Sequence, residues 1–160
     1  MKYRTSFFVL LVVLIFIASG FFRDYVFHNV NAQMRTSYYG QKDTELDPGM
    51  KFLEGYTYLK LYYFKWILTL LFSVLFMGYT LALIRLYFPL KTYLRWVLLA
   101  YGFLFGVAAL FWTGGFLANH SEKGYLIARF LMDMTQSPIM LIVLIPALRM
   151  LKKENAETPG

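Results

Sequence analysis

Arg129 and Asp133 are the residues of this chain whose types and spacing most clearly suggest chemistry. They stand four positions apart inside a long apolar run, so on a helix they share one face and can form an ion pair. Asp133 lies nine positions beyond Gly124, where its helix is expected to begin, and about 1.5 Å per residue places it roughly 13 Å along that helix. If the helix crosses a membrane, that depth is near the middle, where an unpaired carboxylate is costly or binds a proton. Asp133 therefore needs a partner, and Arg129 is the nearest candidate.

Gln136 and Ser137 extend this polar face by another turn. The second apolar run carries its own polar stripe: Tyr58, Tyr62, Lys65, Thr69, Ser73 and Thr80. We expect the two stripes to face each other and to form one intramembrane polar cluster: Lys65, Arg129, Asp133 and Gln136. Its two cations exceed its single acid, which suits an anionic headgroup or a substrate carboxylate. The alternative is a structural ion pair that fastens two helices. A proton relay is a third alternative, which one acid without a histidine serves poorly.

The cysteine and histidine content of the chain excludes most kinds of catalytic site. The chain has no cysteine, so thiol nucleophiles, thiolate metal sites and disulfides are absent. Its histidines, His28 and His120, lie outside the apolar runs, and neither a hydrolytic triad nor a carboxylate pair can be assembled inside them. The stretch 120–122, His-Ser-Glu, is too short for a metal site. We therefore expect no enzyme activity, no metal and no cofactor.

The elements that carry these residues follow from composition. Of the 160 residues, 59% are hydrophobic and only 16% charged, whereas soluble domains have roughly 45–50% apolar and about 25% charged residues. The surplus apolar residues form four runs, at about 7–22, 64–88, 96–117 and 125–148. The last three reach the roughly 20 residues that cross about 30 Å of hydrocarbon, and none alternates in polarity as a β-barrel strand would. The sequence therefore predicts an all-α, polytopic membrane protein with four transmembrane helices in a single membrane domain, 1–160.

Two of these runs leave a choice open. The first has basic residues before it and the small residues 18–20 near its end, as in a cleaved signal peptide. Phe21 and Phe22 prolong it, which favours a retained anchor. The fourth contains Pro138 and Pro146, and each proline removes one helical N–H and permits a kink.

Charge near the helix ends sets the expected orientation, because cytoplasmic flanks keep an excess of Lys and Arg. Eight basic residues fall on one side of the predicted helices: Lys2, Arg4, Arg85, Lys91, Arg95, Arg149, Lys152 and Lys153. On the other side, segment 23–60 balances five basic residues with five acids. We therefore expect a bacterial-type inner membrane, both termini and the tail 149–160 in the cytoplasm, and an external loop of about 38 residues. The net charge of +7 then reflects topology, and no nucleic-acid partner is expected.

The external loop and the third run offer candidate contact surfaces. Residues 21–31 are expected to form a helix that lies on the outer membrane face or extends from it, and 40–50 a solvated bend followed by a tyrosine-rich belt. Gly102 and Gly106, with Ala109 a turn further, form a small-residue face that lets two helices approach closely. This face serves packing within the chain or a partner, and the spacing does not decide between them.

The C-terminal region resembles small exosortase-associated membrane proteins. The resemblance rests on Gly-Tyr-Leu-Ile-Ala-Arg-Phe-Leu at 124–131, Gln-Ser-Pro at 136–138 and Leu-Ile-Pro-Ala at 144–147, about 25 residues in all. It implies a protein that accompanies a membrane transpeptidase and has no assigned catalysis. The exosortases themselves use a cysteine with arginine and histidine, and this chain has no cysteine.

We therefore expect a non-catalytic accessory or assembly subunit of a larger envelope complex, with membrane lipid and a larger membrane protein as partners. Its partner surface would be the face of Gly102 and Gly106 together with the external loop. The alternative is a small transporter or a lipid- or anion-binding protein that uses Lys65, Arg129 and Asp133.

Overall fold

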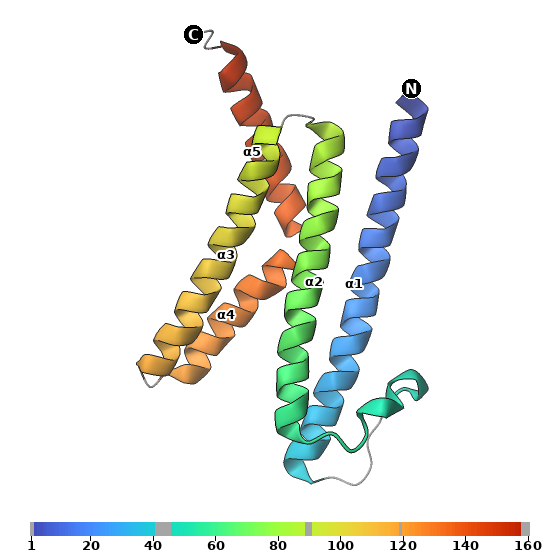
Figure 1. Cartoon of the computed structure of the whole chain (residues 1–160), viewed down its shortest axis with the longest axis vertical. Coiled ribbons are helices and arrows are strands. Elements are labelled where there is room, and N and C mark those ends of the chain that lie inside the picture. The colour runs from blue at the N-terminus through green and yellow to red at the C-terminus, as the bar shows by residue number, and fades with distance from the viewer. Residues whose placement is uncertain (1, 41–45, 89–90, 119, 158–160) are drawn as a thin grey trace. The chain divides into compact units, whose positions relative to one another are not determined.

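The computed structural model describes residues 2–40, 46–88, 91–118 and 120–157, without the side chains of 2–5, 91, 121 and 152–157. All regular structure in these ranges is helical, which confirms the all-α prediction. The elements are α1 (Lys2–Tyr39), η1 (Pro48–Leu53), α2 (Tyr58–Tyr87), α3 (Lys91–Leu117), α4 (Ser121–Thr135) and α5 (Ile139–Glu157) (Figure 1).

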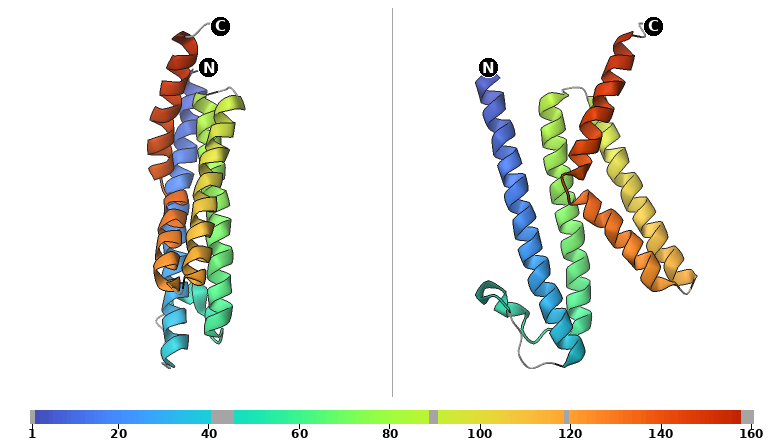
Figure 2. Two further views of the ribbon diagram at one scale, coloured as in Figure 1. Left: turned by 90° about the vertical axis from the view of Figure 1, so that its left-hand side faces the viewer. Right: turned by 180° about the vertical axis from the view of Figure 1, so that it is seen from behind.

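Among the described residues, three helices are long and apolar enough to cross a membrane: Ser6–Tyr39, Tyr58–Tyr87 and Thr92–Leu117. The segments Glu122–Thr135 and Ile139–Leu151 pass the same test only as a pair, and they are bent by 65° where they meet. Figure 2 shows this bend between α4 and α5. The predicted single helix over 125–148 is therefore wrong, and the pair forms either a broken span or a re-entrant loop.

The break has a local cause. Pro138 has no N–H to continue the helical hydrogen-bond ladder, and the residues before it close α4 with turn bonds. Gln136 N donates to Asp133 O at 3.2 Å, and Ser137 N and Oγ both donate to Met134 O, at 3.3 and 2.8 Å. A new ladder then begins as Leu141 N donates to Pro138 O at 3.0 Å. The predicted kink at Pro138 is thus a complete interruption, whereas Pro146 lies inside α5.

α1 is longer than predicted. It continues without interruption through the first apolar run and the whole of 23–39, and its 38 residues extend about 57 Å at about 1.5 Å per residue. Charged residues do not end it, because Arg23 pairs with Asp24 at 3.0 Å and its guanidinium lies 5.3 Å from the centre of the Phe27 ring. The helix expected over 21–31 is therefore present as a continuation of the first one, which agrees with the alternative that it extends from the first run. Similarly, α5 reaches Glu157, so most of the predicted tail is helical.

The chain divides into two compact units: residues 14–72, and residues 73–160 with 1–13. In the first unit, the stretch 46–57, which we call the connector, is mostly exposed, and residues 41–45 of the predicted solvated bend over 40–50 lie outside the described residues. Its Met50 and Leu53 pack in one buried cluster with Val26 and Val30 of α1 and Leu61 of α2. Two further ring contacts join these helices, since Phe72 lies 6.3 Å from Phe22 and 6.0 Å from Phe27 between ring centres. The unit thus has a hydrophobic core that includes the connector.

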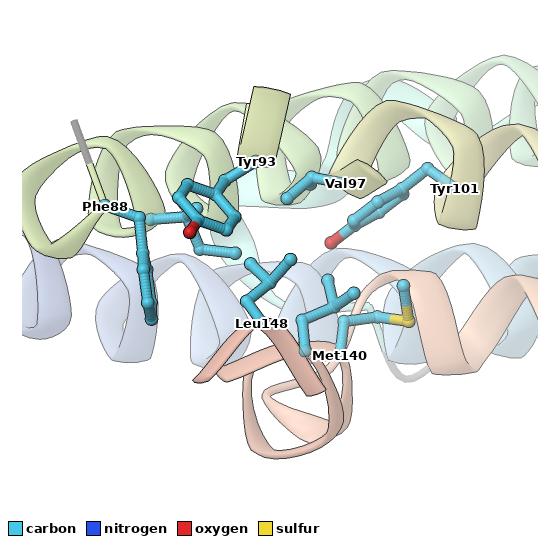
Figure 3. Close-up of a cluster of buried hydrophobic side chains, with 8 residues drawn as sticks. Phe88, Tyr93, Val97, Tyr101, Met140 and Leu148 are labelled. Atoms are coloured by element: carbon cyan, nitrogen blue, oxygen red, sulfur yellow. The ribbon is translucent and has the colours of Figure 1, made fainter. Parts of the chain in front are cut away.

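The second unit has a core of its own between the end of α2, the first half of α3 and α5. Its buried members are Ile84, Phe88, Tyr93, Val97, Tyr101, Met140, Leu144 and Leu148 (Figure 3). One hydrogen bond adds to this core, because the hydroxyls of Thr80 and Tyr101 lie 2.9 Å apart.

A hairpin of α3 and α4 completes this unit, and its closest backbone approach is between Gly115 and Gly124. A Cβ atom built on Gly115 would lie 2.7 Å from Gly124 Cα, and one built on Gly124 would lie 2.5 Å from Phe111 O. Ala108 and Ala128 are buried further along the same interface. Small residues therefore allow the two helices to pack at backbone distance, as expected for helices in lipid.

The predicted small-residue face lies elsewhere on α3. Gly102, Gly106 and Ala109 are all exposed, and no described atom lies within 4 Å of a Cβ built on either glycine. Both alternatives, packing within the chain and contact with a partner, stay open. The use of the face by a partner stays a prediction.

We predict that Gly124→Ala destabilises the purified protein by about 1–3 kcal/mol, because the added methyl group has no room between two backbones. Gly102→Ala and Gly106→Ala are matched controls on an open face, and they should leave stability within about 0.5 kcal/mol. Thermal unfolding in detergent, followed by circular dichroism, measures both. Equal effects at the two kinds of site would contradict the hairpin contact.

Candidate functional site

The predicted pair on α4 lies on the helix face that is turned away from α3. Arg129 Nε is 3.9 Å from Asp133 Oδ2, and the two side chains are 50% and 48% exposed. The opposite face of the helix, with Gly124, Ala128 and Met132, is buried. The two charges therefore form an open i, i+4 pair on the outer face of α4.

Gln136 does not share that outer face. Its side chain is 3% exposed, and its Nε2 donates to Ser73 Oγ of α2 at 2.8 Å. Thr135 Oγ1 donates to the same oxygen at 3.1 Å. In a continuous helix Gln136 would lie two turns beyond Arg129 on one face, but α4 ends at Thr135 and the chain changes direction there. The helix break thus turns Gln136 towards Ser73.

Ser73, Thr135 and Gln136 form what we call the break cluster. All three are buried, and they join α2 to the interruption between α4 and α5. This is the place where polar residues of the second and fourth runs meet, as predicted for the two stripes, although the charged members of the stripes are not part of it. Another stripe residue, Thr80, instead bonds to Tyr101 of α3.

Lys65 belongs to the other unit and has a partner that the sequence did not reveal. Its Nζ donates to Asn31 Oδ1 of α1 at 2.7 Å. Asn31 lies in the part of α1 that was expected to be outside the first run, so a contact with the second run depends on α1 continuing past residue 22. The four predicted cluster residues thus have three different surroundings in the structure.

Sequence reasoning also missed a buried polar lock between α1 and the connector. Asn29 is 1% exposed, and its Nδ2 donates to Tyr25 O and to Asp47 Oδ2, both at 3.0 Å. Asp47 N donates in return to Asn29 Oδ1 at 3.0 Å. The available signal was the helical spacing of Asn29 with Val26, Val30 and Gln33. The two-way bond fixes the start of η1 against α1.

Exposed aromatic rings cluster where α1 ends and α2 begins. The ring of Tyr38 lies 5.1 Å from that of Tyr39 and 5.6 Å from that of Tyr58. All three are exposed, as is Phe52 of the connector. These rings form a surface with both apolar and hydroxyl groups, which suits either a headgroup region or a protein partner.

Within the described ranges, no group of three or more His, Asp or Glu residues could hold a metal ion. The structure brings polar groups together in four places: the break cluster, the bonds between Asn29 and Asp47, the bond between Lys65 and Asn31, and the exposed pair of Arg129 and Asp133. Each of these can position helices, and the open pair and the aromatic surface can also contact another molecule.

We predict that Asn29→Ala destabilises the first unit by about 1–3 kcal/mol, because it removes two hydrogen bonds between α1 and the connector, one of them to the charged carboxylate of Asp47. Asp47→Ala should cost a similar amount, and the double variant little more than either single one, since both remove the same bonds. The exposed neighbour His28→Ala is the control. Limited proteolysis of the connector measures these effects, and additive losses would show that the two residues act separately.

No family model, curated protein or solved structure matches this chain. The resemblance of residues 124–147 to exosortase-associated proteins therefore stays a prediction that rests on those residues alone.

Proposed function

We propose that this protein is a non-catalytic membrane subunit that accompanies a larger membrane protein in an envelope complex. The observation that carries the proposal is the outer face of α4. Arg129 and Asp133 are about half exposed there, in a helix that belongs to an apolar run. A charged side chain near the middle of a bilayer costs about 2.5–3.5 kcal/mol even on the most permissive scales.

This cost sets a requirement on the surroundings of α4. A membrane helix exposes ionisable groups to protein or to water, and rarely to lipid. A partner helix that covers the outer face would desolvate the pair less than lipid would. It could also add hydrogen bonds to both charges. The pair is then a recognition element for the partner rather than a fastening within the chain.

Two further surfaces support the same proposal. Gly102, Gly106 and Ala109 leave an open small-residue face on α3, which a second helix can approach closely. The aromatic surface around Tyr38 and Tyr58 is exposed beside the connector. With both termini in the cytoplasm of an inner membrane, as the charge count indicates, this aromatic surface would meet the external part of the partner.

A second candidate function is a small transporter or an anion-binding protein, and one observation favours it. Broken helices at membrane depth are typical of transporter binding sites, because the interrupted backbone offers polar groups to a substrate. The interruption at 136–138, with the buried break cluster beside it, has this form. Its polar groups are already bonded to one another, which makes the accessory function the better supported one.

We predict that a photoactivatable cross-linker placed at Phe130, an exposed position beside Arg129, captures one larger membrane protein in native membranes. Asp133→Asn and Arg129→Ala should each lower that yield about tenfold, with unchanged abundance of the protein itself. Glu122→Gln removes a charge near the start of the same helix and is the matched control. Mass spectrometry of the cross-linked species measures the yield and names the partner.

Three other outcomes would contradict the subunit proposal. Cross-links from Phe130 only to the chain's own α1 would mean that the protein covers the pair by itself. Cross-links only to lipid would mean that the pair faces headgroups. A substrate flux in vesicles of the purified protein that Asp133→Asn abolishes would favour the transporter.

A further inference from the structure

The end of α2 and the start of α3 meet the middle of α5 in the second unit. Phe88, just after α2, lies against Tyr93 near the start of α3, with 5.2 Å between ring centres. Leu148 of α5 packs in the same buried cluster (Figure 3). The end of α2, the start of α3 and α5 up to its middle therefore share one buried apolar cluster.

Each of these helix segments carries basic residues, which we call the basic end. They are Arg85 of α2, Lys91 and Arg95 of α3, and Arg149, Lys152 and Lys153 of α5. The side chains of Arg85, Arg95 and Arg149 are described and exposed. Residues 73–117 contain no acidic residue, and the acids of α5, Glu154 and Glu157, follow its three basic residues.

The packing fixes where the three arginines emerge. Arg85 follows Ile84 and Arg149 follows Leu148, and both Ile84 and Leu148 are buried in the core. Arg95 lies between the buried Tyr93 and Val97, so its side chain leaves the opposite side of α3. The guanidinium groups are thus distributed around the basic end instead of converging on one point.

Aromatic residues mark the same level as an interface. Tyr87 at the end of α2 is 53% exposed, and Trp96 beside Arg95 is 49% exposed. Exposed Tyr and Trp at helix ends prefer the headgroup region, where the ring is in an apolar layer and the polar atom is hydrated. Leu98 and Leu99, two and three positions after Trp96 on α3, are exposed apolar residues suited to lipid chains.

We infer that the basic end binds the headgroups of anionic phospholipids through Arg85, Arg95 and Arg149. The charge is complementary to a phosphodiester headgroup, and the planar guanidinium can donate two parallel hydrogen bonds to one phosphate. Tyr87 and Trp96 at the headgroup region, together with the exposed Leu98 and Leu99, favour a lipid over a soluble anion. A lipid has both a headgroup and apolar chains, so it can contact both sets of residues at once. This inference holds whether or not the protein is a subunit of a complex.

The test uses the full chain with Trp66→Phe and Trp112→Phe, so that Trp96 is the only tryptophan left. The protein is reconstituted in bilayers that contain brominated phosphatidylglycerol or brominated phosphatidylcholine, and quenching of Trp96 gives the relative affinity of the two lipids. We expect a clear preference for phosphatidylglycerol. Each Arg→Gln substitution should reduce it about fivefold, and the triple variant R85Q/R95Q/R149Q should abolish it.

The matched control replaces three exposed basic residues of the other unit, as R35Q/K51Q/K60Q. This variant loses the same net charge and should keep the preference at Trp96. The triple lysine variant R85K/R95K/R149K keeps the charge without the guanidinium fork, and should retain part of the preference. If R85Q/R95Q/R149Q fails to fold, R95Q alone is the deciding variant, because Arg95 points away from the core.

Three results would overturn the inference. Quenching by the two lipids could be equal in the parent protein. The preference for phosphatidylglycerol could survive in R85Q/R95Q/R149Q, or in R95Q where that variant decides. It could also fall equally in the control variant, which would assign the preference to overall charge. Displacement of phosphatidylglycerol by inorganic phosphate would show that the site binds a soluble anion.

Discussion

A polar group that is removed from water must find its partner inside the protein, and this constraint accounts for most of the described tertiary structure. At the interruption between α4 and α5, the side chains of Thr135 and Gln136 turn to Ser73, while Ser137 bonds back to the carbonyl of Met134. At the connector, Asn29 and Asp47 satisfy each other on both sides. Apolar burial brings the helices together, but these bonds determine which residues meet, because a buried donor or acceptor without a partner costs more than its bond contributes.

The long apolar runs predicted the helices well, since a continuous hydrophobic stretch of spanning length has few alternatives to a helix. Helix ends were harder to predict, because they depend on neighbours. Nothing in the stretch after Phe22 indicates that Val26 and Val30 will be covered by Met50 and Leu53, which follow many residues later. For the same reason, the first apolar run was expected to end near residue 22, and the burial of Met50 and Leu53 was not predicted. Pro138 was recognised as a kink, but the turn bonds that convert it into a break belong to Gln136 and Ser137.

For the polar residues too, sequence spacing predicts some contacts, while others depend on the surrounding structure. The i, i+4 spacing of Arg129 and Asp133 is enough to predict their pairing, and the structure has it, loosely. Spacing could not predict that Gln136 leaves their face, because that depends on where α4 ends. The glycines are a parallel case. Gly102 and Gly106 have the familiar pattern, but the close approach belongs to Gly115 and Gly124, which lie on different helices and have no shared sequence pattern.

The lock between Asn29 and Asp47 also has a consequence for the order of synthesis. As the chain leaves the ribosome, the apolar face of α1 is made well before Met50, Leu53 and Leu61, the residues that will cover it. Asn29 likewise precedes Asp47, so until the connector has been translated its amide has only the bond to Tyr25 O within α1. Completion of the first unit must therefore wait for the start of α2, and during that interval the apolar face of the nascent α1 lacks its cover.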